Sequence, residues 1–87
     1  MARYELRFKT SVAKDLRGIA KADVKRIIAR INELSDEPRP AGVEKFSSHE
    51  LYRIRQGVYR GIYRVEDANA VIEVINIAHR REVYRTR

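Results

Sequence analysis

The chain has 87 residues, enough for one small domain, and it contains no cysteine, which excludes disulfides, cysteine-ligated zinc and a cysteine nucleophile. Nineteen lysines and arginines against twelve acidic residues give a net charge of +7, which favours polyanionic partners such as nucleic acid, or an acidic protein that mimics its charge. No apolar run approaches the roughly 20 residues that span a bilayer, and the N-terminus lacks the apolar core of a secretory signal, so we expect a soluble cytoplasmic protein that binds no membrane.

The beginning of the chain predicts a strand and a short helix. Residues 3–9 alternate between apolar and charged side chains, which is the period of a half-buried strand. Residues 10–20 then carry apolar side chains at helical spacing. Thr10 or Ser11 is the expected N-cap of this helix, because a short hydroxyl side chain satisfies a free backbone N–H there.

A longer helix is predicted over residues 22–34, where apolar side chains fall at i, i+3, i+4, i+7 and i+10. This helix must end before Pro38, because proline lacks a backbone donor and disfavours helical geometry in the residue before it. Residues 36–42 form the only connector, and it is too short to link two domains. We therefore expect a single domain over residues 1–87, without repeats.

From Glu50 onward the period changes to two, and turn residues divide the segment into three strands. The predicted strands are residues 50–55, 59–67 and 70–78. Together they form an antiparallel meander. The predicted fold class is therefore α+β: an N-terminal strand, a helical hairpin and a three-stranded meander in one sheet, with the helices on one face and the other face available to a partner.

Alternation along two of these strands places arginines on shared faces. Arg53 and Arg55 point to one side of the first meander strand, and Arg60 and Arg64 to one side of the second. If the chain turns tightly at Gly57, Arg60 comes to lie beside the first pair. A concave arginine cluster would hold phosphate, although any single arginine on a strand is more often an ordinary exposed side chain.

The C-terminal segment collects further polar groups just after a strongly apolar strand. His79 stands at the end of that strand, and Arg80, Arg81 and Tyr84 follow it. Histidine exchanges protons readily near neutral pH, since its unperturbed pKa is about 6.5. Taken alone, such a histidine is more often a surface or capping residue than a catalyst, and the tyrosine more often packs a terminal turn onto the sheet.

The run LYRIRQGVYRGIYRVED, an apolar strand and the run HRREVYR together resemble the RelE/ParE superfamily of toxins from toxin–antitoxin pairs. The likeness extends over the whole chain, and its specific part is residues 51–85. It implies the RelE-like arrangement of strand, helical hairpin and meander. RelE-like members cut mRNA in the ribosomal A site and leave a cyclic 2′,3′-phosphate, whereas ParE-like members share the fold and poison DNA gyrase.

Carried over by position, the resemblance implies that Arg60 contacts the phosphate and that Arg80 or Arg81 is a second arginine of the site, in the C-terminal segment. It also implies that Tyr84 stacks on or orients a base, that His79 transfers protons and that Glu44 is a nearby carboxylate. The other arginines expected to bind RNA are Arg53, Arg55, Arg64 and Arg85.

One departure from the family matters for the chemistry. Another branch of RelE-like enzymes has lysines on the strand where this chain has Arg53 and Arg55, and one of those lysines can serve as a base. Arginine is not deprotonated in proteins, so here these side chains can only hold phosphate. Proton transfer is then expected from His79. Glu44 is the candidate for a second proton-transfer group, and His49 is an equally good candidate for that second role.

We therefore predict a metal-independent endoribonuclease that needs no cofactor or other small-molecule ligand. It would act on mRNA in the 70S ribosome by 2′-hydroxyl attack on the phosphate, and a cognate acidic antitoxin would hold it inactive. Two alternatives remain open at this point. One is a ParE-like gyrase poison, and the other is a non-catalytic basic module that binds nucleic acid.

Overall fold

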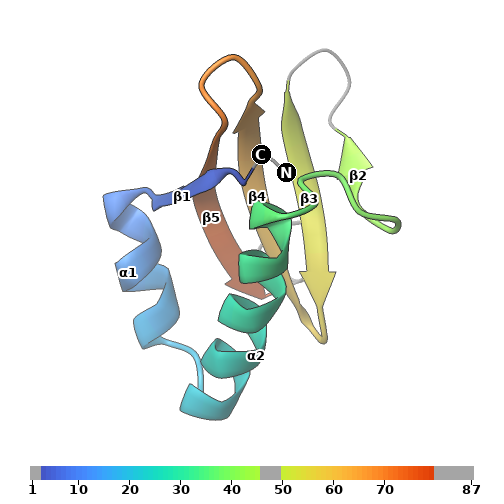
Figure 1. Cartoon of the computed structure of the whole chain (residues 1–87). Helices are drawn as coiled ribbons and strands as arrows, with labels where there is room; N and C mark the ends of the chain where they lie inside the picture. Colours follow the sequence, from blue (N-terminus) through green and yellow to red (C-terminus); the bar gives the residue numbers. More distant parts are fainter. Residues whose placement is uncertain (1–2, 46–49, 80–87) are drawn as a thin grey trace.

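The computed structural model describes residues 3–45 and 50–79, and its elements follow the predicted order. The strands are β1 (Glu5–Phe8), β2 (Glu44–Lys45), β3 (Leu51–Gln56), β4 (Tyr59–Glu66) and β5 (Val71–His79). The helices are α1 (Thr10–Arg17), α2 (Lys21–Asn32) and the short 3-10 helix η1 (Glu33–Ser35). Figure 1 shows one sheet with α1 and α2 on one face, which confirms the predicted α+β class.

The five strands lie in the order β1-β5-β4-β3-β2. The predicted antiparallel meander of β3, β4 and β5 forms the centre of the sheet, and a tight turn joins β3 to β4. Gly57 has a φ of 61° in that turn, a conformation that other residues rarely adopt. β1 lies at one edge, parallel to β5, and β2 lies at the other edge, antiparallel to β3.

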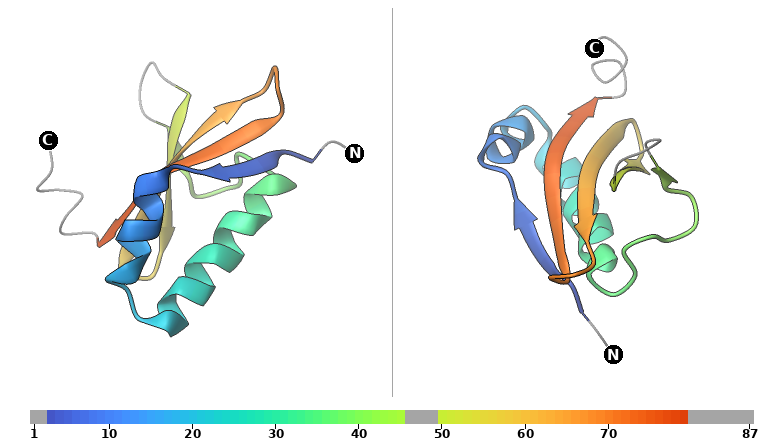
Figure 2. Two further views of the ribbon diagram at one scale, coloured as in Figure 1. Left: turned by 90° about the vertical axis from the view of Figure 1, so that its left-hand side faces the viewer. Right: turned by 90° about the horizontal axis from the view of Figure 1, so that it is seen from above.

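The two helices bury one apolar stripe each against the sheet. Val12 of α1 and Ile27 and Ile31 of α2 are buried, as is Leu34 of η1. They pack in one core with sheet side chains from the central strands: Tyr52, Ile54, Tyr63, Val65, Ile72, Val74 and Ile77. Figure 2 shows the helices together on one side, so no helix of residues 3–45 and 50–79 covers the opposite face of the sheet.

Some local predictions were wrong. α1 begins at Thr10 with Lys9 as its N-cap, and no side chain donates or accepts a capping hydrogen bond there. The helix ends at Arg17, and Gly18 is its C-cap. The strand β2 was missed, since two residues are too few to show a period. No helix in the described part of the chain is long and apolar enough to cross a membrane.

A β-bulge interrupts the pairing of β4 with β5. Ile62 pairs with Asn76 and Tyr63 with Val74, so Ile75 has no partner in the register. A bulge adds one residue to one strand, which exchanges the two faces for every side chain beyond it. The side chains of β5 after Ile75 therefore point to the opposite side of the sheet from the one that uninterrupted alternation would give them.

Candidate functional site

The face of the sheet without helices gathers the predicted arginines. Arg55 is the cross-strand partner of Arg60, and Arg53 is the partner of Ile62, two residues further along β4. Side chains alternate across a strand, so Arg53, Arg55 and Arg60 lie on one face, with Arg64 further along it. The predicted neighbourhood of these arginines is therefore confirmed. We call this surface, formed by Arg53, Arg55, Arg60 and Arg64, the arginine face.

Glu44 extends the arginine face onto the edge strand β2. Its Cα partner is Arg53, whose Nε donates a hydrogen bond to Glu44 Oε1 over 2.9 Å, while Arg53 Nη2 contacts the same oxygen. These hydrogen bonds and the charge of Arg53 lower the pKa of the Glu44 carboxyl, and the charges of Arg55 and Arg60 lower it further. Glu44 is therefore an ionised carboxylate and a weak base at neutral pH.

The arginines of this face differ in their surroundings. Arg60 is only 5% exposed, and its Cα neighbours across the sheet are Arg55 and Ala78. Arg64 has a side chain that is 50% exposed and forms an ion pair with Glu73. A charge–phosphate contact is stronger where water is excluded, so the Arg60 position is the better place to hold a phosphate tightly.

His79 lies on the other side of the sheet. It pairs with Tyr59 across the strands, and the two rings meet edge to face with their centroids 5.7 Å apart. His79 lines a depression of about 260 Å³ together with Asp15 and Gly18. Uninterrupted alternation would place His79 on the face of Glu73, and the bulge at Ile75 explains why it faces α1 instead.

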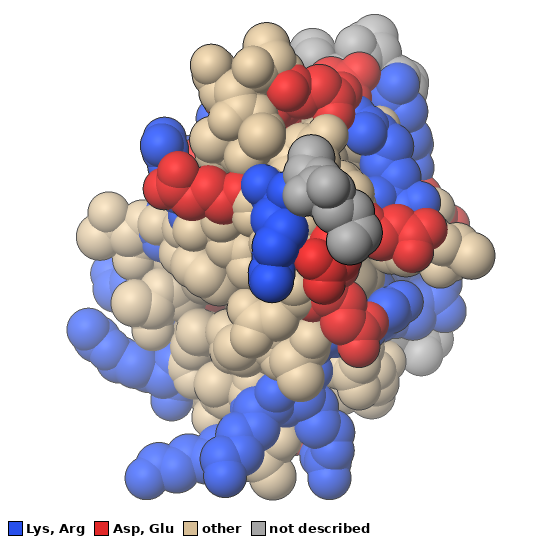
Figure 3. All heavy atoms as spheres, viewed as in Figure 1, with Lys and Arg blue, Asp and Glu red and all other residues tan. Residues whose placement is uncertain are grey.

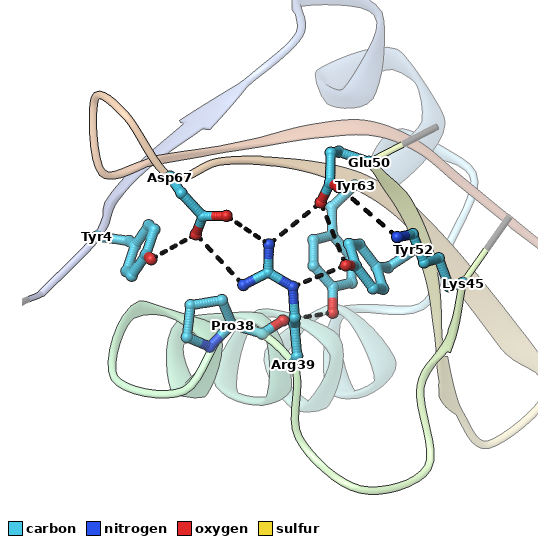
Figure 4. A network of polar contacts seen from close by, with 8 residues as sticks. All are labelled: Tyr4, Pro38, Arg39, Lys45, Glu50, Tyr52, Tyr63 and Asp67. Atoms are coloured by element: carbon cyan, nitrogen blue, oxygen red, sulfur yellow. Dashed lines mark hydrogen bonds and ion pairs between the residues drawn. The ribbon is translucent and has the colours of Figure 1, made fainter. Parts of the chain in front are cut away.

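Sequence reasoning missed a polar network around Arg39 at the other end of the sheet (Figure 4). Arg39 Nε donates a hydrogen bond to Tyr52 Oη over 2.7 Å, and Arg39 Nη2 lies 2.8 Å from Asp67 Oδ2 and 3.1 Å from Glu50 Oε1. Tyr4 Oη also donates to Asp67. The network joins the residue before β1, the segment after η1, the start of β3 and the β4–β5 turn.

Several groups in this network have shifted pKa values. Hydrogen bonds from Arg39 lower the pKa of Asp67 and of Glu50, and the bond from Tyr4 lowers that of Asp67 further. Tyr63, whose hydroxyl donates to Pro38 O over 2.7 Å, has its pKa raised by burial. The network is therefore an ionic and hydrogen-bonded clamp that fixes the connector leading to β2, and no proton-transfer group stands out in it.

Basic side chains also gather on the helical hairpin, on the other side of the sheet from the arginine face. In the view of Figure 3 they project from the lower end of the helical hairpin, where α1 is followed by α2. Lys14 and Arg17 lie in the last turn of α1, and Lys21 begins α2. Within residues 3–45 and 50–79, no group of three or more histidine, aspartate or glutamate side chains is placed to hold a metal ion.

Five predicted site residues lie outside the described residues: His49, Arg80, Arg81, Tyr84 and Arg85. Of the others, the structure brings Glu44, Arg53, Arg55 and Arg60 together, with Arg64 beyond them on the same face. It does not place His79 on that face.

Comparisons with known proteins agree with this geometry. The family of the ParE toxin of the type II toxin–antitoxin system, parDE, matches residues 6–84. Toxin RelG of Mycobacterium tuberculosis is 32% identical over 90 residues, which cover 94% of this chain and 97% of RelG. The archaeal RelE–RelB complex from Pyrococcus horikoshii aligns with a TM-score of 0.78 and 28% identity over 90% of this chain and 96% of the other. The isolated RelE toxin of E. coli aligns with a TM-score of 0.77 and 27% identity over 94% and 92% of the two chains.

Proposed function

We propose a function for this chain from its family: it belongs to the ParE toxin family of type II toxin–antitoxin systems. In this proposal it is a toxin that cuts mRNA on the ribosome and is neutralised by a cognate antitoxin. The observation that carries this proposal is the arginine face, in which a buried Arg60 pairs across the sheet with Arg55. Two arginines side by side suit a phosphodiester, because each guanidinium offers a planar pair of donors.

The reaction makes three chemical demands. A base removes the proton of the 2′-hydroxyl, cations stabilise the phosphate as negative charge builds on it, and an acid protonates the leaving 5′-oxygen. Arg60 is proposed to bind the scissile phosphate, with Arg53 and Arg55 guiding the backbone on either side. None of the three can act as the base, because arginine stays protonated.

Proton transfer is assigned to His79. Glu44 is the weaker candidate, since the arginines around it lower its pKa and Arg53 already occupies its carboxylate. His79 stands at the end of β5 and on the side of Tyr59, so the substrate would have to bend round the end of the sheet to meet both His79 and Arg60. Arg80 or Arg81 and Tyr84 are proposed to complete the site, as the family resemblance implies.

A ParE-like action on DNA gyrase is the second candidate, because the matching family is that of the ParE toxin. The RelE-like function is preferred because the named relatives with more than 25% identity are RelG and RelE toxins. Ribosome-dependent cleavage by the purified protein distinguishes the two. We expect it to cut mRNA in programmed ribosomes at the A-site codon and to leave DNA supercoiling by gyrase unchanged. Intact mRNA together with inhibition of supercoiling by gyrase would favour the ParE-like function.

The antitoxin is proposed to be an acidic segment that folds on binding. A depression of about 420 Å³ on the helical hairpin is lined by apolar side chains, among them Leu16, Ile19 and Val24, and by the basic side chains of Arg17, Lys21 and Lys25. Acidic and apolar side chains on one segment would complement this surface. Co-expression with the neighbouring small reading frame tests the idea: its product should co-purify with the toxin and restore growth, and failure of both would count against it.

A further inference from the structure

The last part of β5 extends beyond its parallel neighbour β1. The pairing of the two strands ends where Phe8 meets Val74, so β1 does not cover β5 from Ile75 to His79. The bulge at Ile75 also changes which backbone groups point toward β1 and α1 after that residue. A backbone N–H on this uncovered side needs a partner from somewhere other than the sheet, because an unsatisfied buried donor is costly.

That partner comes from α1. Asp15 Oδ2 accepts a hydrogen bond from the backbone N–H of Ile77 over 3.1 Å, although the two residues are 62 positions apart. Asp15 lies on α1 three residues after the buried Val12 and next to Leu16, which also packs against the core, so it is on the side of the helix that faces the sheet. The contact therefore joins a partly buried carboxylate of α1 to β5 two residues before His79.

The helix itself gives no reason for an aspartate at this position. Asp15 is the only acidic residue in α1, and it lies in the last turn, where the free carbonyl groups disfavour negative charge. The two basic residues of that turn, Lys14 and Arg17, do match the helix dipole. Aspartate is also a weak helix former. The hydrogen bond with Ile77 is the interaction of Asp15 that can offset this unfavourable position.

Asp15 and His79 also border the same depression of about 260 Å³, which Tyr59 of the neighbouring strand lines as well. Tyr59 contacts one side of the histidine ring edge to face. We propose that Asp15 is a positioning residue, which fixes the end of β5 and so sets the location of the His79 ring. This proposal rests on the proposed function for its effect on catalysis, but the contact itself is independent of any activity.

The first test compares two substitutions of Asp15 in the full chain. Asp15→Leu removes the acceptor, and we expect single-turnover mRNA cleavage on ribosomes to fall by about tenfold to a hundredfold, because small misplacements of reacting groups are costly. Asp15→Asn keeps an oxygen that can accept the Ile77 N–H, so it should retain most of the rate. Asp23→Asn, at a partly exposed aspartate paired with Arg26, serves as the matched control.

A double-mutant cycle separates positioning from general loss of structure. In a His79→Gln background, Asp15→Leu should change the rate by less than about twofold, because the group that it positions is already absent. An equal loss in both backgrounds, or an equal loss for Asp15→Asn and Asp15→Leu, would overturn the proposal.

Amide hydrogen exchange tests the contact without using activity. The N–H of Ile77 should exchange at least about tenfold faster in Asp15→Leu than in the unmodified chain, while the core amides of β4 keep their protection. If the protein cuts no mRNA but this exchange pattern is found, the proposed function fails and the anchoring contact stands. Unchanged exchange at Ile77 would overturn the anchor whatever the activity.

Discussion

Arg60 is the residue on which phosphate binding depends most in this account. Replacing Arg60 by alanine should lower single-turnover cleavage by roughly a hundredfold, the typical effect of losing one preorganised donor to a developing charge. Arg64→Ala is the matched control from the same strand, and it should matter much less because Arg64 is half exposed and paired with Glu73. Equal and small effects at both positions would show that β4 supplies only general electrostatic attraction.

His79 is the residue to which we assign proton transfer. His79→Gln should retain ribosome and antitoxin binding and lose cleavage by roughly 10² to 10⁴, the usual range for a general acid or base. His49→Gln is the control, and it should leave both properties intact. A His79→Gln protein that cuts at the unmodified rate would make the histidine structural, and positioning with charge would then have to account for the reaction.

Glu44 is expected to act through charge rather than as a base. Its carboxylate pairs with Arg53 and has a lowered pKa, so it competes with a phosphate for the same guanidinium. Glu44→Gln should therefore bind single-stranded RNA severalfold more tightly at low salt, and the difference should shrink as salt is added. Fluorescence anisotropy at two salt concentrations measures this. Weaker binding by the variant would contradict the competition.

At the residue scale, sequence reasoning succeeds where alternation is unbroken. It correctly placed Arg53 and Arg55 on one face and Arg60 beside them, because β3 and β4 pair without a bulge from Leu51–Arg64 to Gln56–Tyr59. It could not place His79, because the bulge that turns it toward α1 has no clear signature in a run of apolar residues. It also missed Asp15, whose partner is a backbone group of a distant strand.

At the scale of elements, hydrophobic period predicted both helices and the meander, since these carry several turns or alternations each. The parallel placement of β1 beside β5 depends on tertiary packing, so no local sequence pattern predicts it. The Arg39 network was invisible for a similar reason: the partners Glu50 and Asp67 lie 11 and 28 residues away along the chain. The connector looked like a simple loop, but it contributes the arginine that joins four segments.

The Arg39 network should stabilise the protein near neutral pH. Arg39→Met removes its ion pairs and the hydrogen bond to Tyr52, and we expect a loss of roughly 1 kcal/mol in the free energy of unfolding, since the partners are partly exposed. Urea denaturation measures this loss. An unchanged midpoint would show that solvent screening cancels the network.

The pH dependence of that loss follows from the carboxylates. The folded-state pKa values of Asp67 and Glu50 are lowered, so their contribution to stability is complete above their unfolded values and disappears as the pH falls through the folded ones. The difference between Arg39→Met and the unmodified chain should therefore be largest at pH 7 and shrink below about pH 4. A difference that stays constant with pH would assign the effect to packing on Tyr52 instead.

For the whole molecule, two basic surfaces lie apart from one another. The arginine face occupies the side of the sheet without helices, whereas Lys14, Arg17 and Lys21 lie at the end of the helical hairpin. A net charge of +7 attracts any polyanion, so charge alone does not separate a nuclease from a binding module. The distinction depends on chemistry at the arginine face, where one buried arginine lies beside an exposed one.

Primer extension on cellular mRNA after brief expression of the chain tests the central claim most directly. We expect new 5′ ends inside translated reading frames within minutes, bearing a 5′-hydroxyl, and their absence when Arg60→Ala is expressed at the same level. Intact mRNA in cells whose growth has stopped, together with DNA damage, would contradict the account and identify a gyrase-directed toxin.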